Sequence, residues 1–359
     1  MTRPTTCTFS SENLLHNLAT IRATAPRAKI MAMVKANAYG HGIVEVGHRL
    51  DGLVDALGVA SVDEALILRS AGVRAPITLI EGIFTPDEFR IASEQKFCVA
   101  FHHAGQIQAL KDNPPRHLLH AWLKIDTGMG RLGFLPEDVP DALKALSNSP
   151  SLRQPVGILS HFACADEPEH PQNQKQITAF QKFTATYKGP KSFCNSAAIF
   201  SIPSQHYDWV RPGLSLYGAS PLAGRTAESL GLKPVMTLRS RLISIKTVQQ
   251  GETIGYGSRF QCPETMPVGI IAIGYGDGYP RSAQNGTPVL VNQTRCPVIG
   301  RVSMDMTAID LRPCPTAAVG AEVTLWGDGL PIEEVAETTS NINYDLLTGV
   351  RERARMGWV

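Results

Sequence analysis

Ala32-Met-Val-Lys-Ala-Asn-Ala-Tyr-Gly-His-Gly42 places a single lysine, Lys35, at the end of an apolar run and follows it with polar residues and glycines. This order is typical of a parallel strand that opens into an active-site loop. A lysine there can form a Schiff base with an aldehyde cofactor, while neighbouring hydroxyl groups and backbone amides hold the cofactor's phosphate. The less specific interpretation is a solvated lysine at the end of an ordinary strand.

Outward from this stretch, short apolar runs alternate with amphipathic segments from Lys29 to about Gly218. Two amphipathic segments, at 14–21 and 65–71, follow serines that can cap a helix. The apolar runs are candidate strands at 31–35, 56–60, 77–81, 97–101, 122–126, 156–161, 192–196 and 209–214. Eight strands that alternate with helices predict an α/β fold with a (β/α)8 TIM-like barrel rather than an open sheet.

The pattern changes near Lys233-Pro234. Segments with the alternating polarity of strands follow at 237–248, 269–274 and 288–291, separated by glycine and proline. One helix is expected at 332–338. We therefore predict two domains, a cofactor-binding barrel at 1–231 and a mostly β domain at 232–359.

The composition of the 359 residues is that of an ordinary globular protein, with 43% hydrophobic and 18% charged residues. The formal net charge of +2 favours neither nucleic acid nor an anionic membrane as a partner, so we expect a small-molecule substrate.

The seven cysteines are scattered without a Cys-x-x-Cys pair, which predicts reduced thiols and no metal site. Residues 1–10 lack the apolar core of a signal peptide, and no apolar run reaches the roughly 18 residues that span a bilayer. We expect a cytoplasmic protein.

Residues 34–42 resemble the pyridoxal-phosphate attachment motif of the alanine racemase family. Further segments resemble that family's signatures in the same order, almost to the C-terminus. They are Lys124-Ile-Asp-Thr-Gly-Met-Gly-Arg131, Ser160-His161-Phe162, Cys194-Asn195-Ser196, Val210-Arg211-Pro-Gly213, Gly255-Tyr256-Gly257, Gly274-Tyr275-Gly-Asp-Gly-Tyr279-Pro280-Arg281, Val302-Ser-Met304-Asp305 and Tyr344-Asp345. The resemblance implies a pyridoxal 5'-phosphate-dependent enzyme that interconverts L- and D-alanine.

Active sites of such barrels lie at the carboxyl ends of the strands, and phosphate commonly binds after the seventh and eighth strands. Ser196 and the backbone of Gly213 and Leu214 fall there, and the resemblance adds Tyr39 and Tyr344 as phosphate donors. The expected cofactor-binding residues are Lys35, Tyr39, Arg131, His161, Asn195, Ser196, Arg211, Gly213, Leu214 and Tyr344.

Arg211 bears on the type of reaction. A guanidinium that faces the pyridine nitrogen of the cofactor disfavours protonation of that nitrogen, so the ring becomes a weaker electron sink. This suits a reaction that removes and returns a proton with few side reactions. The alternative role of Arg211 is a structural salt bridge.

Racemisation needs acid–base groups on the two faces of the α-carbon. Lys35 would serve one face, and by resemblance Tyr256 would serve the other. A phenol has a pKa of about 10, so it needs positive charge nearby, for which we expect His161 and Arg211.

In this family the tyrosine reaches the site from the partner subunit, which implies a homodimer with shared active sites. The resemblance places Arg131, Met304 and Asp305 at the substrate, and Tyr275 and Tyr279 along the access corridor. Lys124 matches a lysine that is carbamylated in many relatives; an unmodified lysine is the alternative.

Three other readings compete. A broad-specificity or serine racemase of the same fold differs by a few atoms of pocket space. A barrel-fold basic amino acid decarboxylase would need an acidic partner for the pyridine nitrogen, where Arg211 stands, and a catalytic cysteine near the C-terminus, where no cysteine follows Cys314. A single-domain cofactor carrier would lack the β domain. A biosynthetic role that supplies D-alanine for peptidoglycan and a catabolic role both remain open.

Overall fold

The computed structural model describes residues 3–359, which form two compact units. One unit comprises Leu18–Leu216 and Pro221–Gly224, and the other comprises the residues up to Asn17, Tyr217–Ser220 and Arg225–Val359. The predicted boundary at 231/232 assigned the N-terminus to the barrel domain, whereas the structure groups its described part with the β unit.

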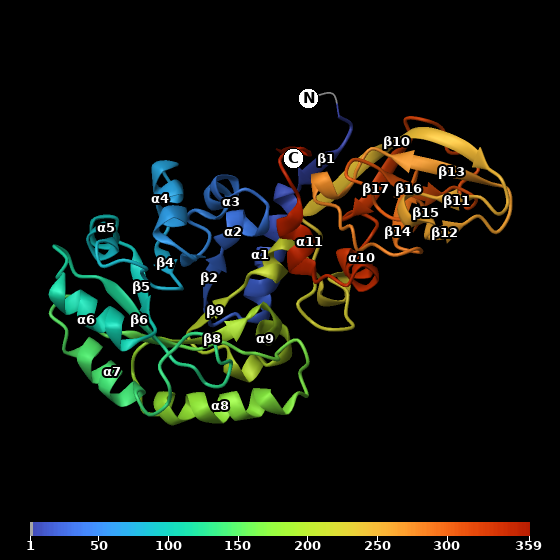
Figure 1. Cartoon of the computed structure of the whole chain (residues 1–359). Helices are drawn as coiled ribbons and strands as arrows, with labels where there is room; N and C mark the ends of the chain where they lie inside the picture. Colours follow the sequence, from blue (N-terminus) through green and yellow to red (C-terminus); the bar gives the residue numbers. More distant parts are fainter. Residues whose placement is uncertain (1–2) are drawn as a thin grey trace. The chain divides into compact units, whose positions relative to one another are not determined.

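Eight parallel strands form a closed barrel, which confirms the predicted fold (Figure 1). The ring closes where Lys29 and Ile30 pair with Trp209 and Val210. The strands are β2 Lys29–Met33, β3 Ala56–Val59, β4 Ile77–Leu79, β5 Cys98–Phe101, β6 His120–Lys124, β7 Gly157–Leu159, β8 Lys191–Asn195 and β9 Trp209–Arg211.

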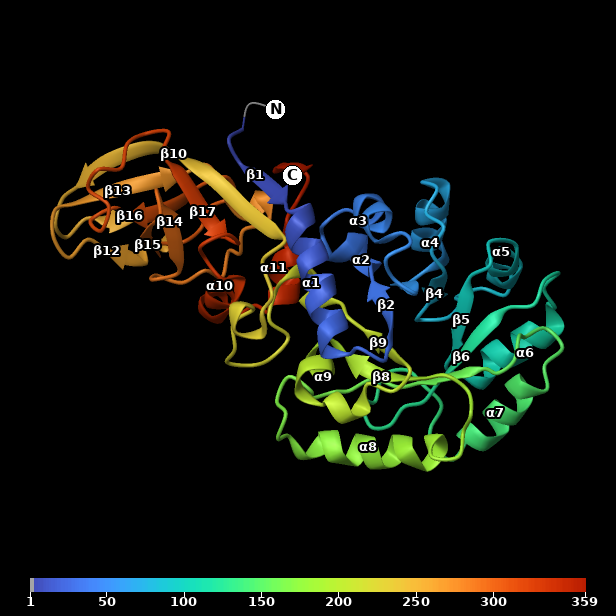
Figure 2. The same cartoon turned by 180° about the vertical axis from the view of Figure 1, so that it is seen from behind.

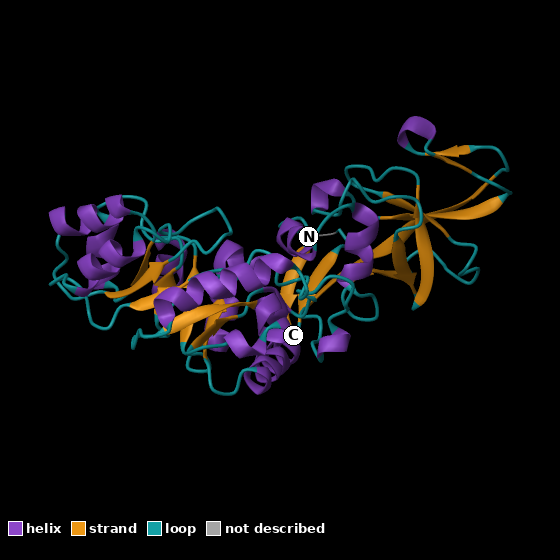
Figure 3. Cartoon of the chain, turned by 90° about the horizontal axis from the view of Figure 1, so that it is seen from below, coloured by secondary structure: helices purple, strands orange, loops and turns teal. Residues whose placement is uncertain are grey.

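Helices follow the barrel strands and surround them, as Figure 2 and the purple helices of Figure 3 show. The predicted caps are present, because Ser10 Oγ accepts the Asn13 amide and Ser61 Oγ accepts the Glu64 amide. The helices are α1 Ser11–Thr24, α2 Lys35–Tyr39, α3 Ile43–Leu50, α4 Val62–Ser70, α5 Glu88–Glu94, α6 Ala104–Asp112, α7 Val139–Ser147, α8 Pro171–Thr184 and α9 Ser196–Ser201, with 3-10 turns η1 Pro203–Gln205 and η2 Leu214–Tyr217.

Aromatic side chains fill the barrel unit. Phe162 stacks on Phe193 with ring centroids 3.8 Å apart, and Phe180 packs against the same ring. A Cβ atom on Gly157 would lie 2.2 Å from the Trp122 ring, so only glycine fits that position of β7. This close packing gives the carboxyl ends of the strands a rigid base.

The second unit is mostly β, as predicted, and its main sheet is mostly antiparallel. Strand β13 pairs with β10 as well as β16. Its strands are β1 Thr6–Phe9, β10 Met236–Val248, β11 Thr253–Ile254, β12 Phe260–Gln261, β13 Met266–Ile271, β14 Pro288–Val291, β15 Thr294–Ile299, β16 Thr307–Asp310, β17 Glu322–Trp326 and β18 Arg355–Trp358. Its helical segments are α10 Ile332–Thr339, α11 Asn343–Gly349, η3 Glu228–Leu230, η4 Tyr256–Ser258 and η5 Tyr275–Asp277.

The strand β1 explains why the N-terminus belongs to this unit. Thr6–Phe9 pairs antiparallel with β10 and parallel with β18. Its partners lie more than 220 residues further along the chain, so no local pattern indicates the pairing.

Candidate active site

The backbone after Lys35 turns in the left-handed sense. Ala36, Asn37, Ala38 and Tyr39 all have φ between +53° and +54°. A left-handed residue other than glycine costs about 1–2 kcal/mol, and such strain is commonly held at functional sites. The Asn37 side chain holds this turn by accepting the Ile43 amide at 2.8 Å, and Glu64 holds it by accepting the Ala36 amide at 2.7 Å.

Lys35 lies at the carboxyl end of the barrel and forms an ion pair there. Its Nζ is 3.2 Å from Oε1 of Glu81, and about a third of each side chain is exposed. The sequence placed Lys35 at the end of the strand, whereas β2 already ends at Met33. Glu81 was not among the residues that the sequence singled out.

Ser196 forms the centre of a small polar cradle. Its Oγ accepts the backbone amide of Gly213 at 2.8 Å and the amide of Ser215 at 3.3 Å. A Cβ atom on Gly213 would lie 2.3 Å from the Tyr39 hydroxyl oxygen. The left-handed turn therefore brings Tyr39 against the segment that follows β9, whose amides bind Ser196 of the segment after β8, as a phosphate site would need.

Arg211 is 3% exposed and lies among polar groups of neighbouring strands. Its guanidinium donates to Ser192 Oγ, to the carbonyl oxygens of Ser160 and Phe193, and to Nδ1 of His161 at 3.3 Å. Burial lowers the pKa of Arg211 to about 10, so the group is a cation at neutral pH. These contacts fix its position at the end of β9.

His161 does not supply the positive charge that the sequence analysis expected of it. Burial, together with the nearby Arg211 and Arg131, lowers its pKa well below the usual value, so the ring is neutral at pH 7. A neutral ring can accept the hydrogen bond from Arg211. Asn195 Nδ2 lies 3.5 Å from His161 Nε2, and its Oδ1 caps α9 by accepting the Ala198 amide.

Lys124 ends β6 and is buried. Burial and the charges of Arg211 and Arg131 lower its pKa to about 8. The loop after it, which carries Arg131, wraps around Asp126. The Asp126 carboxylate accepts the amides of residues 128–131 at 2.9–3.2 Å, and these hydrogen bonds hold its pKa below the usual value against the opposing effect of burial.

The remaining predicted residues lie in the β unit. Tyr256 is 69% exposed on the turn that joins β11 to β12, where the flanking Gly255 and Gly257 have positive φ. Met304 and Tyr344 are also exposed, and Asp305 is half-buried. Tyr279 is an exception to the corridor prediction, because it is fully buried and stacks on Trp326 with ring centroids 6.1 Å apart.

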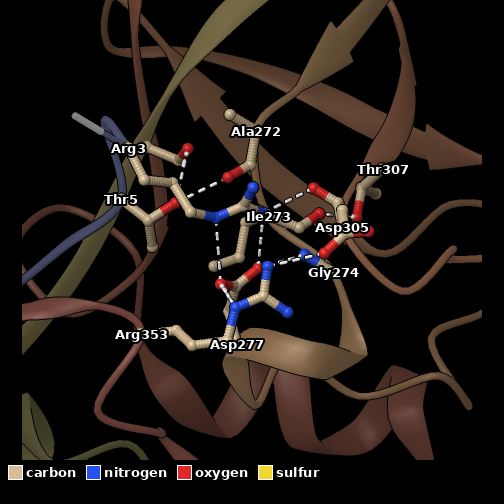
Figure 4. A network of polar contacts seen from close by, with 10 residues as sticks. Arg3, Thr5, Ala272, Ile273, Gly274, Asp277, Asp305, Thr307 and Arg353 are labelled. Atoms are coloured by element: carbon tan, nitrogen blue, oxygen red, sulfur yellow. Dashed lines mark hydrogen bonds and ion pairs between the residues drawn. The ribbon is translucent and has the colours of Figure 1, made fainter. Parts of the chain in front are cut away.

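A polar network holds the segment that carries Met304 and Asp305 (Figure 4). The fully buried Asp277 accepts hydrogen bonds from Nε and Nη2 of Arg3 at 3.1 and 2.8 Å and from the Gly274 amide at 3.0 Å. Arg3 also donates to the Asp305 carbonyl oxygen, and Arg353 donates to Asp305 Oδ1 at 2.6 Å. The sequence analysis did not single out Asp277, Arg3 or Arg353.

Within residues 3–359, all seven cysteines are free and no group of three potential ligands could hold a metal ion. The same residues include no helix long and apolar enough to cross a membrane.

The barrel residues suit pyridoxal phosphate. Lys35 offers a primary amine, the Ser196–Gly213–Tyr39 cradle offers donors at a place that a Cβ atom would fill, and Arg211 and Arg131 supply positive charge. Pyridoxal phosphate carries an aldehyde, which an amine can bind, and a phosphate dianion, which hydrogen-bond donors and positive charge can bind.

Comparisons with known proteins identify the family of this chain. Residues 9–221 match the family described as alanine racemase, N-terminal domain, and residues 235–357 match alanine racemase, C-terminal domain. An alanine racemase of Coxiella burnetii is 44% identical over 98% of this chain and 97% of its own length.

Solved structures give the same result. The crystal structure of biosynthetic alanine racemase from Pseudomonas aeruginosa is 41% identical, with a TM-score of 0.97 over 99% of both chains. An alanine racemase from Bartonella henselae with covalently bound pyridoxal phosphate is 26% identical, with a TM-score of 0.88 over 99% of both chains. Both halves of this chain thus match in sequence and in fold, and the chain belongs to the alanine racemase family of isomerases.

Proposed function

We propose that this chain racemises alanine with pyridoxal 5'-phosphate attached to Lys35, by a two-base mechanism in which Tyr256 comes from the partner subunit. The observation that carries the proposal is the grouping at the barrel mouth of an amine, a polar cradle and the arginines. Lys35, Tyr39, Asn195, Ser196 and Gly213 would hold the cofactor, with Leu214 and Tyr344 as further contacts.

When bound, the cofactor withdraws electrons from the α-carbon and so acidifies its C–H bond. Nζ of Lys35 then takes or gives the proton on one face, and the phenol oxygen of Tyr256 does so on the other. Because His161 is neutral, the cation that supports a phenolate is Arg211. Arg131, Met304 and Asp305 would orient the substrate carboxylate.

A homodimer is part of the proposal, since Tyr256 belongs to the β unit and is largely exposed. Met304, Met306 and Ile342 of that unit are also exposed apolar side chains. Exposed apolar groups of this kind mark interaction sites, and a second copy of the barrel would cover them.

Carbamylation of Lys124 is supported by its lowered pKa. A pKa of about 8 leaves part of the lysine as the neutral amine near neutral pH, and only the neutral amine reacts with carbon dioxide. The product is an anion beside Arg131 and Arg211. Labelling with ¹³C-bicarbonate should give a carbamate NMR signal that disappears in Lys124→Met.

The test of the function is a panel of L-amino acids, incubated with the chain and pyridoxal phosphate and analysed by chiral chromatography. Rapid formation of D-alanine with little D-serine or D-lysine supports the proposal, whereas a broad set of D-products supports the broad-specificity racemase. Decarboxylated amines or no turnover would refute it. Lys35→Ala should abolish turnover, and Tyr256→Phe should slow one direction of proton transfer more than the other.

The seven free thiols support a cytoplasmic location. Because the reaction runs in both directions, the same site would serve the supply of D-alanine for peptidoglycan and the formation of L-alanine for catabolism.

A further inference from the structure

The backbone of Glu81 is held at the mouth of the barrel. It follows β4, and the Ile80 amide before it still donates to Val59 of β3. Gly82 after it has φ of +80°, and a Cβ atom there would lie 2.5 Å from the Ala100 carbonyl oxygen, so the turn requires glycine. His102 Nε2 lies 3.0 Å from the Glu81 carbonyl oxygen and fixes it from the next strand.

The barrel geometry explains why Glu81 meets Lys35. Alternate strands of a (β/α)8 barrel contribute side chains to the same layer. Lys35, Glu81 and Lys124 follow or end β2, β4 and β6, which are alternate strands of the ring. The Glu81 carboxylate accordingly interacts with both lysines. It lies 3.2 Å from Nζ of Lys35, and its negative charge favours the protonated form of Lys124.

Lys35 must lose protons before it can bind an aldehyde. An ammonium group has no lone pair, and imine formation removes two protons from the nitrogen. Arg131 and Arg211 lie nearby as cations, and the buried His161 ring accepts a hydrogen bond from Arg211. A carboxylate in direct contact with Nζ is the group that can accept a proton there.

We propose that Glu81 positions Lys35 and accepts its proton when the cofactor is loaded; this inference rests on the proposed function. The Glu81 carboxylate takes one proton from the ammonium, and the freed lone pair forms a bond to the aldehyde carbon. The aldehyde oxygen leaves as water with two protons from the lysine nitrogen, one of them passed back from the Glu81 carboxyl group. The product is the protonated imine, and Glu81 is again a carboxylate.

The test is the rate at which the full chain, freed of cofactor, forms the imine on addition of pyridoxal phosphate, followed by absorbance. Glu81→Gln keeps the shape of the side chain and removes the base. We expect it to slow bond formation at least tenfold at pH 7, with Glu81→Asp recovering part of the rate. The titratable groups that face Glu81 are Lys35, Lys124 and His102.

Glu45→Gln is the matched control, because Glu45 on α3 also forms an ion pair, but with Arg49, at 2.7 Å. It should load at the wild-type rate. A rate for Glu81→Gln within twofold of wild type would overturn the inference. If the wild-type chain forms no imine, or reduction with borohydride labels a lysine other than Lys35, the proposed function fails instead.

Discussion

Replacing Asp277 by asparagine tests whether the network of Figure 4 holds the Met304–Asp305 segment. The carboxylate is fully buried and receives both arms of the Arg3 guanidinium as well as the Gly274 amide. Asparagine has nearly the same shape, but its Nδ2 is a donor that would face the donors of Arg3. The substitution therefore removes the charge and one acceptor without leaving a cavity.

The expected cost is about 3 kcal/mol. Breaking a buried ion pair costs about 3–5 kcal/mol, and a hydrogen bond to a charged group contributes about 1.5–3 kcal/mol. The lower end applies because the Arg3 and Arg353 side chains are 26% and 43% exposed, so water partly solvates the guanidinium charges that remain. Arg3 would also loosen its hold on the Asp305 carbonyl oxygen.

Hydrogen exchange measures this locally. If the segment exchanges by local opening, about 3 kcal/mol corresponds to a rate increase of roughly a hundredfold for amides at 272–278 and 303–307. Asp328→Asn is the control, since Asp328 is 82% exposed and forms a long ion pair, at 3.5 Å, with Arg239. If these amides exchange no faster in Asp277→Asn than in Asp328→Asn, the network does not hold the Met304–Asp305 segment.

Three further substitutions test other features of the site. Ala36→Gly should leave the free energy of unfolding unchanged or raise it by up to about 1 kcal/mol, because glycine adopts the left-handed conformation without strain. The control Ala19→Gly, in the right-handed α1, should lower the free energy of unfolding by about 1 kcal/mol. Equal losses for the two variants in urea unfolding would contradict the left-handed turn. Gly213→Ala should weaken pyridoxal phosphate binding about tenfold in a fluorescence titration, because its Cβ displaces the Tyr39 hydroxyl, and unaltered affinity would count against the cradle. His161→Gln should reduce the loss of stability on acidification below pH 6.5. There the unfolded chain takes up a proton that the folded ring, with its lowered pKa, does not, and an unchanged pH profile would argue against a buried neutral ring.

The strand order of the barrel could be predicted because each strand is a short apolar run between amphipathic segments. The predicted strands extend beyond the observed ones at most carboxyl ends. The first was expected to reach Lys35, but β2 ends at Met33 and the chain enters the left-handed turn. That turn depends on hydrogen bonds that the Asn37 and Glu64 side chains accept from backbone amides, which no local propensity reveals.

The contacts between distant segments could not be predicted. Glu81 meets Lys35 only because β2 and β4 are alternate strands of a closed ring. The motif around Tyr275 and Tyr279 drew attention to its tyrosines, yet the structure shows that Asp277 is the hub and that Tyr279 belongs to the core. An aromatic residue within a signature segment can thus belong to the core rather than line the access corridor, and its burial distinguishes these two roles.

The environment of the barrel mouth explains why His161 is neutral and why a carboxylate is present. Burial lowers the pKa of His161, and the charges of Arg211, Arg131, Lys124 and Lys35 lower it further. A phosphate and a substrate carboxylate would balance most of this positive charge once bound, so the site is suited to anionic ligands before any chemistry occurs. Glu81 then cannot serve as the main counter-charge for the ligands, since it would repel them. Its place beside Nζ makes sense if its partner is the lysine itself, at the stage when that lysine must give up a proton to bind the cofactor.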